Sequence, residues 1–228
     1  MPTAAQDPAA KSAGTMDPPI RAVVALGNPG RKYAETRHNV GWMVADALAA
    51  RHGLGWQQKF NGEFGRMRVP GKGTWVGQDV SVLKPGTFMN LSGHPTQAMA
   101  AFYGYAPAEL LVMHDELDLP FGRIQIKAGG GHGGHNGLRS LVAQLGDPTF
   151  VRVRIGIGRV KADGRPEGKQ GEQADFVLAP FATDERPWLP DLIGRAADAV
   201  QLILELGVRA AMNTVHGAPR KGATEAKT

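Results

Sequence analysis

The first clearly patterned stretch of the chain is a short apolar run followed by a turn and an amphipathic segment. Residues 22–26 read Ala-Val-Val-Ala-Leu, which is typical of a strand buried on both faces. Gly, Asn and Pro over 27–30 predict a sharp turn, because Gly and Asn tolerate positive φ and Pro fixes its own φ. From Val40 the apolar positions recur at helical spacing, and Gly53 can end this helix as a C-cap.

The same reading predicts alternating strands and helices along the rest of the chain. Short alternating stretches between 57 and 84 indicate two or three strands joined by hairpin turns. Further apolar or alternating runs predict strands at 110–113, 123–127, 151–157 and 175–178. Helical spacing followed by Gly predicts helices over about 90–103, from the Gly-rich segment to Leu145, and from Thr183 to Leu206, with one more helical stretch to His216.

This alternation favours one α/β domain, a mixed and mainly parallel twisted sheet sandwiched between helices. We expect the domain to span residues 21–216. Residues 1–20 are rich in Ala, Pro, Asp, Ser and Thr and lack an apolar signal core, so a disordered extension is expected there. Residues 217–228 are expected to form a disordered tail.

Composition narrows the possible chemistry. The 228 residues include no cysteine, which excludes disulfides, thiolate metal ligands and a catalytic thiol. No apolar stretch approaches the ~20 residues that cross a bilayer, so we expect a cytoplasmic protein without membrane association.

The positive charge is concentrated in one part of the chain. The formal net charge is +5, yet residues 121–170 alone carry nine Lys or Arg against three acids, which leaves the remainder close to neutral. A basic sector on a balanced protein suggests a polyanionic partner. A solvated charged face is the alternative interpretation.

Polar side chains follow several of the predicted strands. Asn28 and His38 flank the first turn, Asp115 follows the run at 110–113, and His135 with Asn136 follows the Gly-rich segment. A histidine that acts as a general base needs its second ring nitrogen held by an acceptor, and Asp115 is the best-placed candidate. Without a Gly-x-Ser-x-Gly motif or a cysteine, this pattern indicates activation of water. Asn90, at the start of a predicted helix, adds a third amide that can position a substrate without adding charge.

Each of these features also has a plainer interpretation. His38 can cap its helix, and Asp115 can be an ordinary turn acid. The Gly-rich segment fits neither Gly-x-Gly-x-x-Gly nor a P-loop, and its glycines can serve only tight turns. His114, His132 and His135 could bind zinc, although their spacing matches no standard metal motif, and we expect no metal.

Five segments of the chain, taken in order, contain most of these polar residues. The segments are Gly27-Asn28-Pro29-Gly30 with Tyr33 and Thr36-Arg37-His38-Asn39-Val40-Gly41; Lys84-Pro85 with Phe88-Met89-Asn90-Leu91-Ser92-Gly93; His114-Asp115-Glu116-Leu117-Asp118 with Gly122; Gly129 to Gly137 with Leu138; and Arg154-Ile155-Gly156-Ile157-Gly158. Together they resemble the motifs of bacterial-type peptidyl-tRNA hydrolases. The resemblance runs from about Arg21 to Leu206, and five motifs in register are far more specific than any one of them.

The resemblance implies a hydrolase that cleaves the ester between a peptide and the terminal ribose of tRNA and so recycles tRNA. By motif, His38 would be the general base and Asp115 would orient it. Asn28 would hold the substrate or the attacking water near the ester carbonyl. The peptide and the terminal nucleotides would be bound by Asn90 and Asn136, beside a cleft lined by Tyr33, Met89 and His135.

The resemblance also implies that Lys127 and Arg154 hold the 5′-phosphate of the acceptor stem, in agreement with the basic sector. It implies a monomer and no cofactor. Ala25 departs from a position where the family often has Gly, and the segment 159–173 matches no family motif. Two rivals stay open: an RNA-binding adaptor on the same fold that has lost hydrolysis, and a nucleotide- or metal-dependent enzyme that uses the Gly-rich loop.

Overall fold

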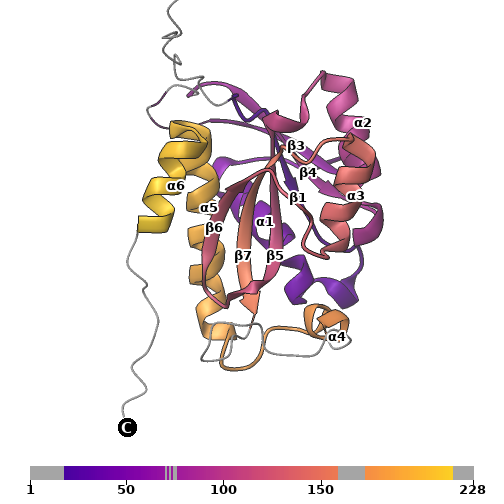
Figure 1. Cartoon of the computed structure of the whole chain (residues 1–228), viewed down its shortest axis with the longest axis vertical. Coiled ribbons are helices and arrows are strands. Elements are labelled where there is room, and N and C mark those ends of the chain that lie inside the picture. Colours follow the sequence, from indigo (N-terminus) through magenta and orange to yellow (C-terminus); the bar gives the residue numbers. More distant parts are fainter. Residues whose placement is uncertain (1–17, 70, 72, 74–75, 159–172, 218–228) are drawn as a thin grey trace, which may run out of the picture.

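One seven-stranded sheet with helices on both of its faces forms the framework of the computed structural model, which describes residues 18–69, 71, 73, 76–158 and 173–217 (Figure 1). The strands follow the spatial order β2-β3-β4-β1-β5-β7-β6. Their bounds are β1 Ala22–Ala25, β2 Gln57–Lys59, β3 Gly62–Arg68, β4 Asp79–Pro85, β5 Leu110–Pro120, β6 Ile124–Ala128 and β7 Val151–Gly158.

The α-helices alternate with these strands along much of the chain. They are α1 Val40–His52, α2 Gly93–Tyr103, α3 Asn136–Leu145, α4 Gln173–Leu178, α5 Leu189–Leu206 and α6 Val208–Gly217. Short 3-10 turns precede several of them, including η2 Arg37–Asn39 before α1 and η3 Met89–Leu91 before α2. The glycines predicted to follow α1, α2 and α3 do so with positive φ, at Gly53, Gly104 and Gly146.

The sheet is mixed, with the parallel pairings at its centre. β1 pairs in parallel with β4 and β5, and β5 pairs in parallel with β7. The outer pairs β2–β3, β3–β4 and β6–β7 are antiparallel. The predicted mixed sheet between helices is confirmed, but the parallel pairings equal the antiparallel ones in number because hairpins add β2, β3 and β6 at the two edges.

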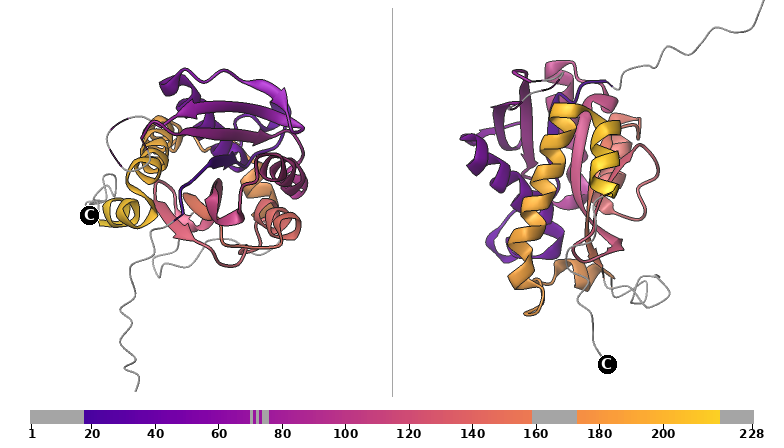
Figure 2. Two further views of the ribbon diagram at one scale, coloured as in Figure 1. Left: turned by 90° about the horizontal axis from the view of Figure 1, so that it is seen from above. Right: turned by 90° about the vertical axis from the view of Figure 1, so that its left-hand side faces the viewer.

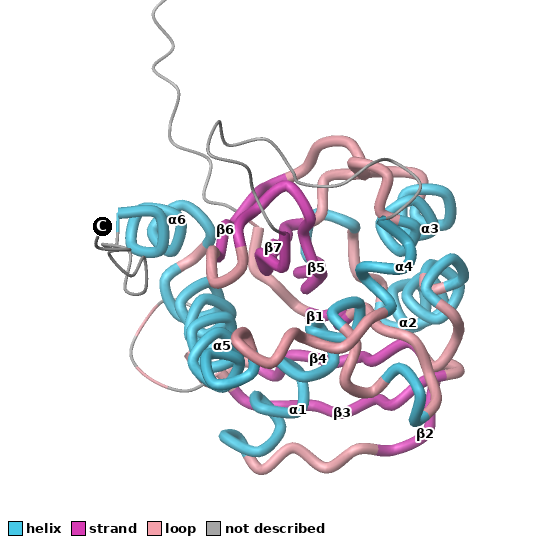
Figure 3. The backbone as a smooth tube through the Cα atoms, turned by 90° about the horizontal axis from the view of Figure 1, so that it is seen from below, coloured by secondary structure: helices cyan, strands magenta, loops and turns pink. Residues whose placement is uncertain are grey.

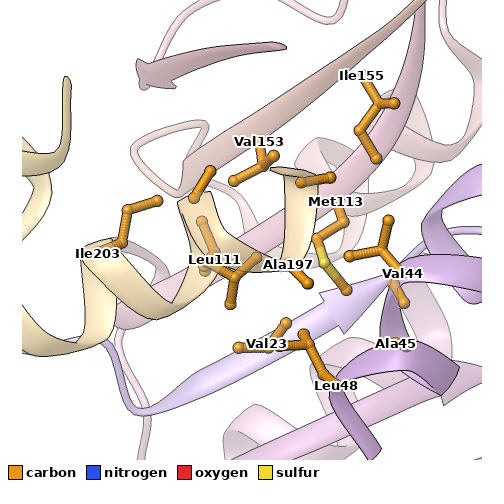
Figure 4. Close-up of a cluster of buried hydrophobic side chains, with 14 of the residues drawn as sticks. Val23, Val44, Ala45, Leu48, Leu111, Met113, Val153, Ile155, Ala197 and Ile203 are labelled. Carbon is orange, nitrogen blue, oxygen red and sulfur yellow. The ribbon is translucent and has the colours of Figure 1, made fainter. Parts of the chain in front are cut away.

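Alternate residues of the central strands serve two separate core layers. Val23 of β1 packs with Leu111 and Met113 of β5 beneath α1 and α5 (Figure 4). Val24 points to the other face, where Val112 and residues of α2 and α3 form the second layer. Figure 3 shows α5 and α6 on one side of the sheet and α2 and α3 on the other. In Figure 2, α5 and α6 lie side by side along the sheet.

Several predicted boundaries differ from the structure. The segment at 175–178, predicted as a strand, belongs to α4, because a short apolar run does not by itself distinguish strand from helix. Ile20 is buried in the core and Gly217 ends α6, each one residue outside the 21–216 range expected for the domain. The predictions of disorder otherwise concern residues 1–17 and 218–228, which lie outside the described residues, as does most of the unmatched segment 159–173.

Candidate active site

The candidate site lies where β1 ends while its neighbour β5 continues. The parallel register pairs Ala25, the last residue of β1, with Met113 of β5. β5 runs on to Pro120, so Asp115 lies within the strand, opposite Ile155 of β7. The prediction that Asp115 terminates a core strand was therefore wrong in detail. The carboxylate nevertheless lies beyond the carboxyl end of β1, the edge at which open α/β sheets place their sites.

His38 approaches Asp115 from the 3-10 turn η2. Its Nδ1 lies 2.9 Å from Asp115 Oδ1 and 3.0 Å from Oδ2, and a carboxylate can only accept, so Nδ1 carries the proton and donates. The other ring nitrogen, Nε2, makes no hydrogen bond to any described residue. The His38 side chain is 10% exposed and that of Asp115 only 2%. The neutral imidazole is therefore oriented with Nε2 available as a base.

His135 is a second hydrogen-bond donor to the same carboxylate. Its Nε2 lies 2.9 Å from Asp115 Oδ1, and its Nδ1 accepts the backbone N–H of Gly137 at 3.1 Å and that of Leu138 at 3.4 Å. His135 is thus the N-cap of α3. The two backbone N–H groups require an unprotonated Nδ1, so the neutral tautomer with its proton on Nε2 is the one that fits both contacts.

The burial and charges of the cluster move the pKa values in opposite directions. Burial alone would raise the pKa of Asp115, but the charges of His38 and His135 and their hydrogen bonds hold it well below its usual range. Burial lowers the pKa of His38, whereas the charge of Asp115 and the hydrogen bond to it raise that pKa, and the net effect is an increase above 6.5. Asp115 therefore stays ionised at neutral pH, and the pKa of His38 lies above that of a free imidazole.

Asn28 is fixed by hydrogen bonds at its backbone and its side chain. Its backbone N–H donates to Asn39 Oδ1, and Asn39 Nδ2 donates to the Asn28 carbonyl, both at 2.9 Å. Its side-chain Oδ1 accepts the backbone N–H of Met89 at 2.8 Å. The Asn28 Nδ2 group donates to no described residue. The side-chain amide is therefore oriented by its oxygen, with its N–H groups available to a ligand.

The other predicted substrate-binding residues occupy segments that are tied to this cluster. Met89 is buried, and a Cβ on Gly137 would lie 2.5 Å from its sulfur, so η3 and the start of α3 pack tightly here. Asn90 and Asn136 are exposed. In the chain Asn90 directly follows Met89, which bonds to Asn28, and Asn136 directly follows His135, which bonds to Asp115. Tyr33 is half-buried and packs edge-to-face on Phe88, with ring centroids 6.3 Å apart.

His114 is held outside the acid–base chemistry. It is buried, its Nδ1 donates to the backbone carbonyl of Asp115 at 2.7 Å, and its ring meets that of His135 at a centroid distance of 5.0 Å. Burial and the neighbouring His135 lower the pKa of His114 to about 3. It therefore stays neutral at physiological pH.

One group of side chains in the described part of the chain has donors close enough to hold a metal ion. His38, Asp115 and His135 each offer a ligand atom, and these atoms lie within 4.8 Å of one another. The set differs from the His114, His132 and His135 set considered from spacing. The hydrogen bonds from both rings to Asp115 account for this grouping without an ion.

The two residues proposed for phosphate binding lie on the edge strand β6 and on its neighbour β7. Lys127 of β6 is exposed, whereas Arg154 of β7 donates to Glu116 at 2.8 Å and also to Gln125. The register pairs Gln125 with Arg154 and Lys127 with Arg152, which places all four on one face of the sheet.

Arg152, the other arginine on this face of β7, is not exposed to solvent. It is buried, donates to the carbonyls of Gly130 and Gly131, and lies over the Phe150 ring at 4.7 Å. Burial lowers the pKa of its guanidinium, as does Arg154. The Arg152 guanidinium thus anchors the Gly-rich loop to β7 through these hydrogen bonds.

Three features of the site were not predicted from the sequence. The bond from His135 to Asp115, the role of Asn39 in fixing Asn28, and the anchoring of the loop by Arg152 all depend on contacts between distant elements. The sequence offered one signal for Asn39, which is that it directly follows His38 in the chain.

The chain matches a family model over most of its length. Residues 22–224 match the model described as "Peptidyl-tRNA hydrolase". Among similar proteins, the peptidyl-tRNA hydrolase of Nocardia farcinica is 48% identical over 196 residues, covering 85% of this chain and 95% of that protein. The peptidyl-tRNA hydrolase of Mycobacterium ulcerans is 50% identical over 194 residues, covering 85% and 96%.

Solved structures agree in fold. The crystal structure of peptidyl-tRNA hydrolase from Acinetobacter baumannii aligns with a TM-score of 0.75 at 39% identity, covering 86% of this chain and 94% of that one. The Arg119Gln mutant of the Acinetobacter baumannii enzyme aligns with a TM-score of 0.76. None of the described helices is both long and apolar enough to cross a bilayer. The resemblance seen in the five motifs is confirmed, and the chain belongs to the peptidyl-tRNA hydrolase family of ester hydrolases.

Proposed function

We propose that this protein hydrolyses the ester of peptidyl-tRNA by direct attack of a water molecule that His38 activates. The observation that carries this proposal is the bond from His38 Nδ1 to the buried Asp115 carboxylate, with Nε2 unbonded among the described residues. Nε2 takes a proton from water as the oxygen attacks the ester carbonyl, and Asp115 stabilises the imidazolium that forms. Neither a cysteine nor a Gly-x-Ser-x-Gly nucleophile is needed for this route.

Asn28 is the proposed donor near the ester carbonyl. Negative charge develops on the carbonyl oxygen during attack, and a pre-oriented amide N–H stabilises it without reorganising. The fixed Oδ1 of Asn28 supports this role because it leaves Nδ2 as the free end of the amide. In other hydrolases, losing one such donor raises the barrier by ~2.7–4 kcal/mol.

The remaining assignments extend the proposal along the substrate. Asn90 and Asn136 bind the peptide backbone and the terminal nucleotides beside Tyr33, Met89 and His135. Lys127 and Arg154 contact the 5′-phosphate of the acceptor stem. Such contacts supply affinity and register without reading sequence, which suits an enzyme that accepts many tRNAs.

The proposal also places the protein in its cellular setting. Hydrolysis returns free tRNA to translation, which locates the activity in the cytoplasm. We propose that the protein acts there as a monomer and without a cofactor.

The test is release of tRNA from an N-acetylated aminoacyl-tRNA by the purified protein. The wild type should release free tRNA, and His38→Ala should lower the rate by ~10²–10⁴-fold, the usual contribution of a positioned base. Binding of the same tRNA should be unchanged, because His38 contacts the reacting centre and not the phosphates. Wild-type protein that binds tRNA without releasing it would instead support the adaptor, and a fully active His38→Ala would rule out His38 as the base.

A further inference from the structure

Arg37, the residue before the proposed base, is buried within a set of contacts that the mechanism above does not use. Its side chain is only 4% exposed although it carries a full charge. Arg37 begins η2, the turn that presents His38, and it points to a segment about 140 residues further along the chain. That segment runs from α4 to the start of α5, and α4 contacts η2 directly.

The guanidinium reaches three acceptors in that segment. Nη1 donates to the carbonyl of Pro180 at 2.6 Å, with a longer contact to the carbonyl of Ala179 at 3.5 Å. Nη2 pairs with Glu185 Oε2 at 2.5 Å, and that carboxylate also accepts the backbone N–H of Ala182 at 2.7 Å. The Arg37 side chain therefore bonds to both sides of the bend between α4 and η5 (Arg186–Trp188).

Backbone and ring contacts reinforce the same junction. The Arg37 N–H donates to the Ala179 carbonyl at 3.1 Å, and Thr36 forms an isolated β-bridge with Pro180. The guanidinium carbon lies 4.2 Å from the centre of the Phe176 ring and 5.5 Å from that of Phe181. These distances are within the range of cation–π attraction. The turn is thus held to this segment by Thr36 and by both the backbone and the side chain of Arg37.

Stability alone is a weak reason for this arrangement. Burying an ion pair costs desolvation that its attraction often fails to recover, and apolar residues of similar size can pack as well or better. What an arginine supplies, and an apolar side chain does not, is a planar fork that fixes direction through several hydrogen bonds. The turn fixed in this way carries the imidazole that must stay in line with Asp115.

We propose that Arg37 is a positioning residue that locks the η2 turn, and with it His38, against the Ala179–Glu185 segment. The inference rests on the proposed function for its kinetic consequence. A shift of η2 by a fraction of an ångström moves His38 Nε2 away from the position in which it can take a proton from the attacking water. Substrate binding, which depends on other side chains, is little affected.

The test compares Arg37→Lys with the matched control Arg51→Lys. Arg51 of α1 makes a similar pair of contacts, to Asp198 at 2.7 Å and the Gly194 carbonyl at 3.3 Å, but at the far end of the helix. Lysine keeps the charge and loses the fork in both variants. In single-turnover hydrolysis, Arg37→Lys should lower the maximal rate by roughly 10- to 100-fold, as expected for a misplaced catalytic group. The half-saturating concentration should stay within about twofold in both variants, and Arg51→Lys should keep the wild-type rate.

A second measurement does not require activity. In an NMR titration of the imidazoles, the pKa of His38 in Arg37→Lys should fall from its wild-type value, because a displaced ring loses the bond to Asp115 that raises it. Glu185→Gln keeps a neutral acceptor for Arg37 and should lie between wild type and Arg37→Lys in both measurements.

The outcomes separate this inference from the proposed function. Inactive wild-type protein with the expected NMR shift would overturn the function and retain the positioning role. Active wild-type protein with Arg37→Lys equal to it in rate and in His38 titration would overturn the positioning role. Equal losses in Arg37→Lys and Arg51→Lys would also overturn it, because the effect would then be general to α1.

Discussion

The pH response of the site follows from one carboxylate shared by two histidines. Asp115 accepts from His38 Nδ1 and from His135 Nε2, both at 2.9 Å. His38 is the ring whose pKa the shared carboxylate raises above its usual value, so it gains a proton on acidification. Its raised pKa means that the charged pair stabilises the fold below the unfolded histidine pKa of about 6.5 and that this contribution is lost as pH rises through the higher folded value. The activity proposed for His38 has the opposite dependence, because a general base must be neutral to accept a proton.

Asp115→Asn should move the pH profile as well as lower the rate. Without the carboxylate, burial remains as the main influence on His38, and burial lowers the pKa of an imidazole. The rising limb of the rate–pH curve should therefore shift to lower pH, with a rate loss of ~10²–10⁴-fold from lost orientation. Asp118→Asn, an exposed acid on the same strand, is the control and should leave both rate and profile unchanged. A profile identical to wild type in Asp115→Asn would remove Asp115 from its proposed role.

At the scale of elements, the site depends on how closely α1 approaches the sheet. A Cβ on Gly41, in the first turn of α1, would lie 2.6 Å from the Leu26 carbonyl oxygen and 2.8 Å from that of Met113. Both atoms belong to the backbone, so neither can rotate away. The glycine allows the helix that follows His38 to sit directly on β1 and β5.

Gly41→Ala should displace α1 and destabilise the protein by ~1–3 kcal/mol, the usual cost of overpacking. The rate should fall as well, since His38 lies only three residues before Gly41 in the chain. Gly55→Ala is the matched control, because no atom lies within 4 Å of its added Cβ and its φ is not positive. Urea unfolding of both variants measures the difference, and equal stabilities would show that α1 can move away from the strands without cost.

The sequence predicted these elements well where local signals were strong. Apolar period and a following glycine located α1 and α3, including their ends at Gly53 and Gly146. α4 was predicted as a strand because its apolar run is too short to show a period, and contacts to Arg37 and its neighbours decide its place. The predicted residues His38, Asp115 and Asn28 lie together in the structure. The bond from His135 to Asp115 joins elements that sequence spacing does not relate.

At the scale of the whole molecule, the basic residues of β6 and β7 differ in how far their charges are already paired within the protein. Arg152 is occupied by carbonyls of the Gly-rich loop, and Arg154 is partly neutralised by Glu116. Lys127 is exposed on the same face of the sheet. Of these three basic residues, Lys127 is the most accessible for a phosphate.

Lys127→Gln should weaken tRNA binding and reduce the slope of log affinity against log salt by about one unit, as expected for one lost phosphate contact. Arg154→Gln should have the same effect on the slope, together with a local rearrangement of Glu116. Arg68→Gln, an exposed arginine of β3 that lies on the other side of the sheet centre from β6 and β7, is the control for net charge alone. Filter binding at several salt concentrations measures the slopes, and unchanged slopes in both phosphate-site variants would place the phosphate contact elsewhere.

Extended dialysis against a strong chelator should leave the hydrolysis rate unchanged. The candidate ligand atoms of His38, Asp115 and His135 are already paired with one another by hydrogen bonds. Loss of activity that a divalent ion restores would assign this cluster to a metal instead.

The central claim is that a neutral His38, oriented by Asp115, removes a proton from the attacking water. Its most direct test is the single-turnover rate of N-acetylaminoacyl-tRNA hydrolysis as a function of pH, for wild type and His38→Ala. The wild-type rate should rise with pH through one ionisation whose pKa lies above 6.5, and His38→Ala should be ~10²–10⁴-fold slower without that ionisation. A His38→Ala profile that retains the same ionisation and rate would contradict the account.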